Sequence, residues 1–239
     1  MDGIAFLGRS MSCVINYLKK LYSGDTTFCL TILSAFSVFL TLVRVIISGH
    51  ALYLFLVKNL ILAIIPWFVS TIIYFGGKKK GFRLHVLVFL WIIFFPNSFY
   101  LMTDIIHLGK GIRTAPVWFD AISLLSYGIC GLLFGIVSLK MMEEKACELI
   151  GRKRSAAVRV VFIYVSCFGI FLGRFLRWNT WDLFMNFFNL ASDVAGLFFC
   201  LPKFLFVCKF TFVAGTFLNL LYIVLVHFNV KNLEEKIQA

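Results

Sequence analysis

Residues 51–81 read ALYLFLVKNLILAIIPWFVSTIIYFGGKKKG, and this stretch decides the class of fold. The apolar part, up to Phe75, is interrupted only by Lys58, Asn59 and Pro66 before a turn rich in Gly and Lys. A helix needs about 20 mostly apolar residues to cross the hydrocarbon core of a bilayer. The stretch therefore predicts a membrane-spanning helix that ends in a polar turn.

The composition of the whole chain agrees with a membrane protein. Its 239 residues are 61% hydrophobic and only 14% charged, whereas soluble domains are typically about 45–50% apolar and about 25% charged. A soluble protein of this composition would have too little polar surface, and a bilayer removes that problem because lipid replaces the polar coat. We therefore expect an all-α integral membrane protein without a separate soluble domain.

Further apolar runs of similar length follow along the chain. Together with the first they predict about six transmembrane helices in a single domain over residues 27–239, at about 27–47, 51–75, 82–103, 117–139, 157–175 and 204–228. The third run contains Pro96, which removes a backbone hydrogen-bond donor. Two alternatives exist there: a helix kinked at Pro96, which we favour, and a half-helix followed by a re-entrant turn.

The stretch from about residue 180 to residue 201 is the hardest to assign. It is apolar, but Asn186, Asn189, Ser192 and Asp193 lie in its middle, and an aspartate inside a membrane is energetically costly. An interfacial or re-entrant helix costs less than a seventh span. We therefore expect such a helix here, and six full spans.

Residues 1–26 predict a cytoplasmic amphipathic helix rather than a cleaved signal segment. No compact apolar core follows a basic start. Apolar residues instead recur at three- and four-residue steps with polar residues between them, as in helices that lie on a membrane surface. A partly ordered tail is the alternative.

The distribution of Lys and Arg predicts how the helices are oriented in the membrane. With the N-terminus inside, 15 of the 23 basic residues lie on the cytoplasmic side and 6 on the other, while Lys58 and Lys209 lie within spans. Cytoplasmic loops carry an excess of Lys and Arg. We therefore expect both termini in the cytoplasm; a seventh span would move only the C-terminus.

The net charge of +12 does not indicate nucleic-acid binding, because the basic residues lie in the gaps between apolar runs. The seven cysteines are scattered and predict neither a disulfide framework nor a metal site. The chain lacks G-x-S-x-G and H-E-x-x-H motifs and a phosphate-binding glycine loop. We expect no cofactor, no metal and no nucleic-acid partner, and we expect membrane lipids around the chain.

Two polar clusters fall on the same, extracytoplasmic face of this topology. The first follows Pro96 and Asn97, where a helix would place Tyr100, Asp104 and His107 on one face. Ionisable groups near a membrane are often functional. Asp104 either binds a ligand or pairs with an arginine of the second cluster and locks two loops together.

The second cluster begins where the fifth span ends, and there Arg174, Arg177 and Trp181 would share a face. Basic and aromatic residues at this place also serve as interfacial anchors, with Asn179 or Thr180 capping the next helix. Lys58 either reaches outward or turns inward toward Asp104 or Asp182. The candidate extracytoplasmic site comprises Lys58, Asn59, Asn97, Tyr100, Asp104, His107, Arg174, Arg177, Asn179, Trp181 and Asp182.

At these positions the chain resembles a known family. Asn59-Leu60 with Ala63 and Pro66, Pro96-Asn97 to Thr103-Asp104, and Arg174 to Asp182 are similar to the bacterial membrane-protein family catalogued as domain of unknown function 1361. The resemblance covers most of the chain from the second span onward and implies a multi-pass protein of the bacterial plasma membrane. It implies no activity, because none is established for that family.

Three classes of function fit these features. We favour a non-catalytic protein of cell-envelope assembly or regulation, which needs only stable loops and a surface for a membrane-protein partner. The alternative is an enzyme for a lipid-linked or anionic substrate, in which Arg174 and Arg177 hold a phosphate or carboxylate and Asp104 is a general base or metal ligand. A small-solute transporter comes third, because the inner halves of the spans offer few polar residues.

Overall fold

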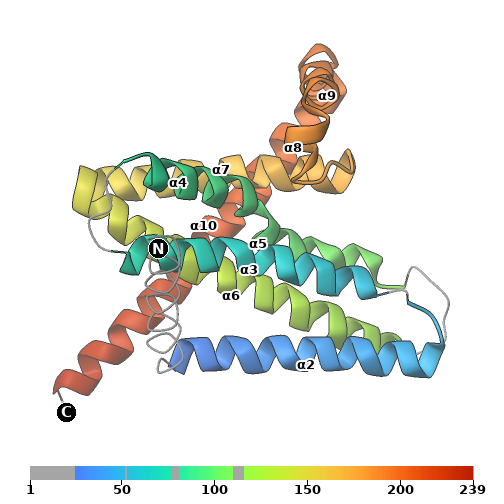
Figure 1. Cartoon of the computed structure of the whole chain (residues 1–239), viewed down its shortest axis with the longest axis horizontal. Helices are drawn as coiled ribbons and strands as arrows, with labels where there is room; N and C mark the ends of the chain where they lie inside the picture. The colour runs from blue at the N-terminus through green and yellow to red at the C-terminus, as the bar shows by residue number, and fades with distance from the viewer. Residues whose placement is uncertain (1–24, 52, 77–80, 110–115, 239) are drawn as a thin grey trace, which may run out of the picture.

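The computed structural model describes residues 25–51, 53–76, 81–109 and 116–238. These residues are helical apart from short connections, as Figure 1 shows. In chain order the elements are α2 (Asp25–Ser48), α3 (Leu54–Phe75), α4 (Phe82–Phe94), α5 (Pro96–Tyr100), the 3-10 helix η1 (Leu101–His107), α6 (Val117–Ile150), α7 (Arg152–Phe175), α8 (Asp182–Met185), α9 (Phe187–Phe199) and α10 (Leu201–Gln238). The amphipathic helix expected over residues 1–26 lies outside the described residues, except for Asp25 and Thr26 in α2.

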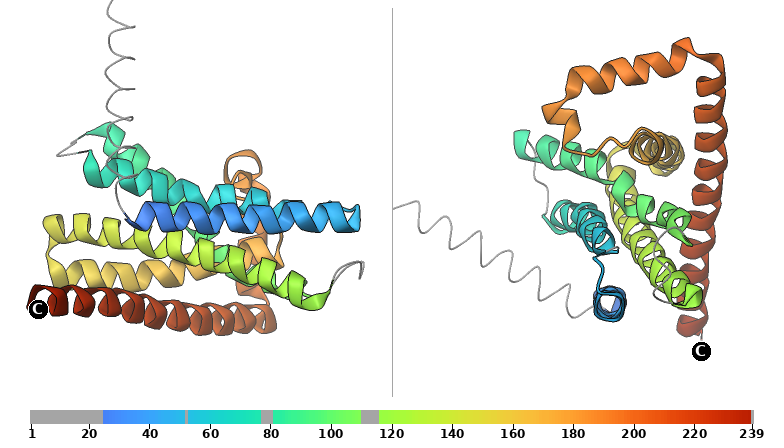
Figure 2. Two further views of the ribbon diagram at one scale, coloured as in Figure 1. Left: turned by 90° about the horizontal axis from the view of Figure 1, so that it is seen from below. Right: turned by 90° about the vertical axis from the view of Figure 1, so that its right-hand side faces the viewer.

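Six helical segments in the described part of the chain are long and apolar enough to cross a membrane. They are α2, α3, the succession α4–α5–η1, α6, α7 and α10 up to Val226. The long helices run roughly alongside one another, as Figure 1 and the left view of Figure 2 show. The prediction of an all-α integral membrane protein with six spans is confirmed.

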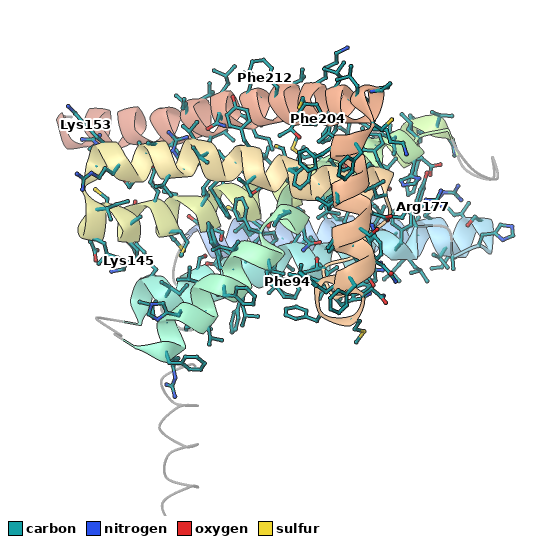
Figure 3. The ribbon with its side chains drawn as sticks, turned by 90° about the horizontal axis from the view of Figure 1, so that it is seen from above. Phe94, Lys145, Lys153, Arg177, Phe204 and Phe212 are labelled. Atoms are coloured by element: carbon teal, nitrogen blue, oxygen red, sulfur yellow. The ribbon has the colours of Figure 1, made fainter. Side chains whose placement is uncertain are left out.

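The helix α9 runs across the bundle rather than along it (Figures 1 and 3). Its 13 residues extend about 20 Å at 1.5 Å per residue, which is less than the hydrocarbon core of about 30 Å. The stretch from about residue 180 to 201 therefore holds the short helices α8 and α9 and no seventh span. The course of α9 across the bundle is the one expected of an interfacial helix.

The third span continues through Pro96 as a kinked helix and does not turn back. The Asn97 side chain donates to the Phe94 carbonyl at 3.0 Å, which gives an acceptor at the kink a partner. Ser98 donates instead to the Ala63 carbonyl of α3 at 3.0 Å. Of the two alternatives for this run, the structure therefore has the kinked helix, and its last turns are of the tighter 3-10 kind.

Glycines on α6 allow the kinked segment to lie unusually close. A Cβ atom at Gly131 would lie 2.3 Å from the Ser98 carbonyl oxygen, and one at Gly135 would lie 2.6 Å from the Phe99 ring. Gly128 also faces the segment, but less tightly, because a Cβ atom there would lie 3.4 Å from the Met102 backbone. Small residues permit such close approach between membrane helices. The residues that follow Pro96 are thereby held inside the protein.

Two glycines of α7 receive the other side of the same segment. A Cβ atom at Gly169 would lie 3.1 Å from the Pro96 ring, and one at Gly173 would lie 3.2 Å from the Tyr100 ring. Their four-residue spacing is that of the G-x-x-x-G motif of close-packed membrane helices. The segment α5–η1 therefore packs between α6 and α7.

Several helices extend beyond the ranges expected from hydropathy. The helix α6 continues to Ile150 instead of ending near 139, and α7 begins at Arg152 instead of 157, with Gly151 between them at φ 82°. Residues 140–150, KMMEEKACELI, are good helix formers although they are too polar for a span. Hydropathy therefore underestimates the length of these helices.

Polar contacts tie α6, α7 and α10 together at the end of the bundle where α7 begins. Arg159 of α7 bonds the Glu143 carboxylate of α6 at 3.0 Å, and Glu143 also accepts a hydrogen bond from Tyr222 of α10. Asn219 of α10 accepts a further bond from Arg159 at 3.4 Å. We call the opposite end, where α3 begins and α7 ends, the Asp104 end.

Candidate functional site

Arg174, in the last turn of α7, is the centre of the candidate site. Its guanidinium bonds Asp104 Oδ1 at 2.5 Å and donates twice to Thr103 Oγ1, at 2.9 and 2.7 Å. A third nitrogen lies 3.1 Å from His107 Nε2, and the Tyr100 ring lies 4.1 Å beneath the guanidinium carbon. The structure thus brings Tyr100, Asp104 and His107 together around one arginine.

Both carboxylate oxygens of Asp104 also have hydrogen-bond partners. Its second oxygen accepts a hydrogen bond from the Asn59 amide of α3 at 3.2 Å. The side chains of Asp104 and Arg174 are only 1% and 5% exposed. A buried pair keeps its charges only when the remaining hydrogen bonds are satisfied, and here α3, η1 and α7 all contribute to satisfying them. The contact therefore has the form of a structural pair that locks three helices.

Lys58 does not turn toward the carboxylates. It is exposed, and its ammonium group lies 5.0 Å from the centre of the Trp181 ring, which is a cation–π contact. In the part of the chain that the structure describes, Lys58 forms no ion pair with Asp104 or Asp182. The alternative in which Lys58 turns inward toward Asp104 or Asp182 is therefore wrong, because its ammonium group contacts the Trp181 ring instead of a carboxylate.

Arg177 does not share a face with Arg174 and Trp181, as the helical pattern predicted. The helix α7 ends at Phe175, and Arg177 has a φ of 62°, in the left-handed region. This conformation reverses the chain, and leaves Arg177 exposed beside α9 at the edge of the site, as Figure 3 shows. The two arginines therefore do not form one anion clamp.

A turn built on Asp182 follows. Its carboxylate accepts hydrogen bonds from the Asn179 backbone at 2.7 Å and from the Asn186 amide at 3.1 Å. The Asn179 backbone N–H, and then the Asn186 amide, hold the pKa of the Asp182 carboxyl below its ordinary value. Trp181 is the N-cap residue of α8, without a side-chain cap bond, so neither Asn179 nor Thr180 has the predicted capping role.

Asn97 connects the kink of the third span to this turn. Its amide nitrogen lies 3.0 Å from Thr180 Oγ1, and the same hydroxyl lies 3.3 Å from the Asn97 amide oxygen. Beyond the turn, the Trp178 indole donates to Asp193 of α9 at 3.0 Å. The connection between α7 and α9 is thereby bonded to the third span on one side and to α9 on the other.

A cavity of about 290 Å³ lies beside the Asp104–Arg174 pair. Residues of α3, the kinked span, α7, the turn and α9 line it, among them Asn59, Asn97, Tyr100, Asn179 and Thr180. The lining residues in the described chain include no Lys, Arg, Asp or Glu. Four of the candidate residues, Asn59, Asn97, Tyr100 and Asn179, thus frame an uncharged cavity next to a closed ion pair.

A second ion pair at this end was not predicted from the sequence. Arg44 of α2 bonds Asp120 of α6 at 2.7 Å, and its guanidinium carbon lies 5.6 Å from the Tyr53 ring. Burial, followed by the negative charge of Asp120, raises the pKa of the Tyr53 hydroxyl. The one available signal was the place of Arg44 and Asp120, each within four residues of the end of its helix at the same side of the membrane.

These features define a six-span, all-α integral membrane protein with an uncharged cavity at one end. The chain belongs to the family described as protein of unknown function DUF1361, whose model matches residues 58–217. The match begins at Lys58 and contains every candidate site residue, while α2 lies outside it. Searches of the curated proteins and of the solved structures found no match.

Proposed function

We propose that this protein is a non-catalytic component of the bacterial cell envelope that acts by binding another molecule at its Asp104 end. The observation that carries the proposal is that the Asp104 carboxylate and the Arg174 guanidinium are paired with each other. Both side chains are buried, whereas the cavity beside them is lined by amide, hydroxyl, aromatic and aliphatic groups, with no charged side chain among the described lining residues. Such a site offers recognition without a reactive group.

The enzyme alternative has less support from the same geometry. It requires Arg174 and Arg177 to hold an anion together and Asp104 to accept a proton. Arg174 already donates to Asp104, Thr103 and His107. Arg177 lies beyond the end of α7 in the left-handed conformation and does not form an anion clamp with Arg174. A general base must reach the proton that it removes, and the Asp104 carboxylate is enclosed by its own partners.

The transporter alternative requires polar groups that continue along a path through the membrane. Ser126 donates to the Ser123 carbonyl within α6, and Tyr127 bonds Thr41 of α2 at 2.8 Å. Asn219 donates to the Gly215 carbonyl within α10. These polar residues bond within their own helix or to a neighbouring helix, which favours a structural role for each of them.

We place the Asp104 end outside the cytoplasm and both termini inside it. The excess of Lys and Arg in the loops at the opposite end supports this orientation. The resemblance to a bacterial membrane family supports a plasma-membrane location. At that face the expected partners are a lipid or a second membrane protein.

The proposal is tested by removing the charges singly and together. Asp104→Asn or Arg174→Gln alone leaves a buried charge without its partner, which typically costs about 3–5 kcal/mol, so each is expected to lower the amount of folded protein. The double variant removes both charges and is expected to recover folding and to complement the envelope phenotype of a deletion strain. The measurements are the thermal midpoint in detergent and survival under osmotic stress.

A matched control uses the exposed Lys145–Glu148 pair of α6, replaced by Lys145→Gln and Glu148→Gln. Exposed pairs are worth about 0–1 kcal/mol, so all three control variants should behave as wild type. A folded, correctly inserted double variant that still fails to complement would show that one of the two ionised groups is needed chemically, and the non-catalytic proposal would be abandoned.

A further inference from the structure

The lining of the cavity changes character along the direction of the spans. On α7, Val165 and Phe168 lie toward the middle of the bundle, and the chain beyond that helix contributes Asn179 and Thr180. The third span shows the same order: Ile92 lies toward the middle of the bundle, and Asn97 and Tyr100 lie toward the Asp104 end. Val165 lies ten residues before the end of α7, or about 15 Å deep at 1.5 Å per residue. The cavity is therefore apolar toward the membrane centre and polar toward the membrane surface.

The apolar part of the cavity borders the lipid-facing surface. Ile92 and Val165 line it and are 43% and 55% exposed. Exposed apolar residues on spanning helices face the hydrocarbon of the bilayer. On the side toward α9, Leu183 and Leu190 line the same cavity, and Figure 3 shows α9 crossing near the kink that follows Phe94. A molecule can thus enter from the bilayer, beneath the crossing helix.

The polar part offers acceptors and no charge. The Asn59 amide nitrogen is used by Asp104, and within the described residues no hydrogen bond is formed by the Asn59 amide oxygen or by the Tyr100 hydroxyl. An anionic headgroup in such a place would lose its hydration without gaining a cation, which is costly. A hydroxyl group can donate to these oxygens and accept from the hydroxyl of Tyr100.

The size of the cavity limits what it can enclose. Pockets that enclose a drug-sized ligand measure about 300–1,000 Å³, so a cavity of about 290 Å³ accommodates a small headgroup and the first part of a chain. The remainder of a lipid would leave between Ile92 and Val165 into the bilayer. The gradient of polarity matches the orientation of a lipid in the leaflet at this end, with its headgroup toward the surface.

We propose that this cavity binds the uncharged, hydroxyl-bearing headgroup of a membrane lipid, a glycerol or sugar unit carried on acyl chains. The inference rests on the proposed binding role, for which it names the ligand class. Asn59, Tyr100 and the Asn97–Thr180 pair hold the hydroxyl groups. The Asp104–Arg174 pair lies behind these groups and does not touch the lipid, and an asparagine at position 104 can still accept the hydrogen bond from Asn59.

The test uses the full-length protein purified in detergent, with monoglucosyl diacylglycerol as the probe and native mass spectrometry as the readout. Wild-type protein is expected to retain this lipid about tenfold better than phosphatidylglycerol, which carries a charge that the cavity does not match. Val165→Phe fills the mouth and is expected to lower the bound fraction about tenfold. Val161→Phe makes the same change one turn away on α7, at a residue that is 61% exposed and does not line the cavity, and should bind as wild type.

Thr180→Val provides a second variant, away from the bilayer-facing surface. It removes the hydroxyl that meets Asn97 and should weaken retention several-fold while the protein stays folded. Equal retention of the two lipids, or equal binding by the Val165→Phe and Val161→Phe variants, would overturn the proposal, because it would indicate unspecific surface lipid. Displacement of the lipid by free glucose at comparable concentration would also overturn it, in favour of a soluble sugar.

The two proposals fail through different observations. Loss of complementation in the folded Asp104→Asn, Arg174→Gln double variant removes the non-catalytic role and does not affect the lipid measurement. Absence of headgroup selectivity removes the lipid class and leaves the complementation result in place.

Discussion

At the scale of single residues, the hydrogen-bonded cluster around Asp104 depends on position 174, where only an arginine can make all the observed contacts. The guanidinium of Arg174 lies over the Tyr100 ring and at the same time donates in its own plane to Asp104, Thr103 and His107. A planar group with several fixed donors can stack and bond at once, whereas a lysine ammonium is a single compact charge. Arg174→Lys is therefore not a conservative change at this position.

Asp182 gives a prediction about pH. Its pKa is lowered in the folded protein, so the carboxylate stabilises its turn above the ordinary value of 3.8, and this contribution is lost as the pH falls through the folded pKa. We expect the turn to exchange its amide hydrogens faster in wild type at about pH 3 than at about pH 5, after correction for the intrinsic rates. Hydrogen–deuterium exchange of the peptide over residues 178–188 measures this.

Asp182→Asn is the control for that experiment, because an amide of similar shape does not titrate. The ratio between variant and wild-type exchange should exceed one at the higher pH and lie closer to one at the lower pH. A ratio that does not change with pH would mean that the charge of Asp182 does not stabilise the turn.

At the scale of elements, the glycine face of α6 places the site. Gly128, Gly131 and Gly135 admit the segment after Pro96, and this segment carries Asn97, Tyr100 and Asp104. Without that close approach, α5 and η1 would stand further from α6, and Asp104 would be less deeply buried. The packing of helices and the geometry of the ion pair are therefore coupled.

Gly131→Ala is expected to destabilise the protein by about 1–3 kcal/mol, the usual cost of overpacking. The added Cβ would lie 2.3 Å from a backbone oxygen, which cannot move without shifting α5. The thermal midpoint in detergent measures the effect. Gly196→Ala in α9 is the matched control: nothing lies within 4 Å of its Cβ position, and alanine favours a helix by about 0.5–1 kcal/mol. Equal midpoints for the two variants would contradict the argument.

At the scale of the whole molecule, the sequence predicts the spans well and the site only in part. Long apolar runs are local properties, so the six spans and the crossing stretch near Asp193 can be found from composition alone. Whether Asp104 binds a ligand or pairs with Arg174 depends on how two helices dock, and hydropathy contains no information about docking. The helix pattern of Arg174, Arg177 and Trp181 failed for a local reason, since α7 ends at Phe175.

The Arg44–Asp120 pair joins the family-matched region, residues 58–217, to a helix that precedes it. The helix α2 lies along one side of the bundle, as Figure 1 and the left view of Figure 2 show. It meets α6 through apolar side chains such as Leu30 and also through polar groups: Thr41 bonds Tyr127, and Ser37 lies 3.4 Å from the Cys130 sulfur. Polar contacts between membrane helices favour one rotation of a helix over others, so this face specifies how α2 docks.

Asp120→Asn is therefore expected to loosen α2, because it removes the carboxylate partner of a buried arginine, at a typical cost of about 3–5 kcal/mol. A cysteine at position 37 reports on docking, since Ser37 and Cys130 are adjacent. Under a mild oxidant, the Ser37→Cys variant should form a disulfide with Cys130, and adding Asp120→Asn should lower its yield several-fold. Thr31→Cys, on the exposed side of α2, should give little disulfide in either background. An undiminished yield with Asp120→Asn would show that apolar packing alone holds α2.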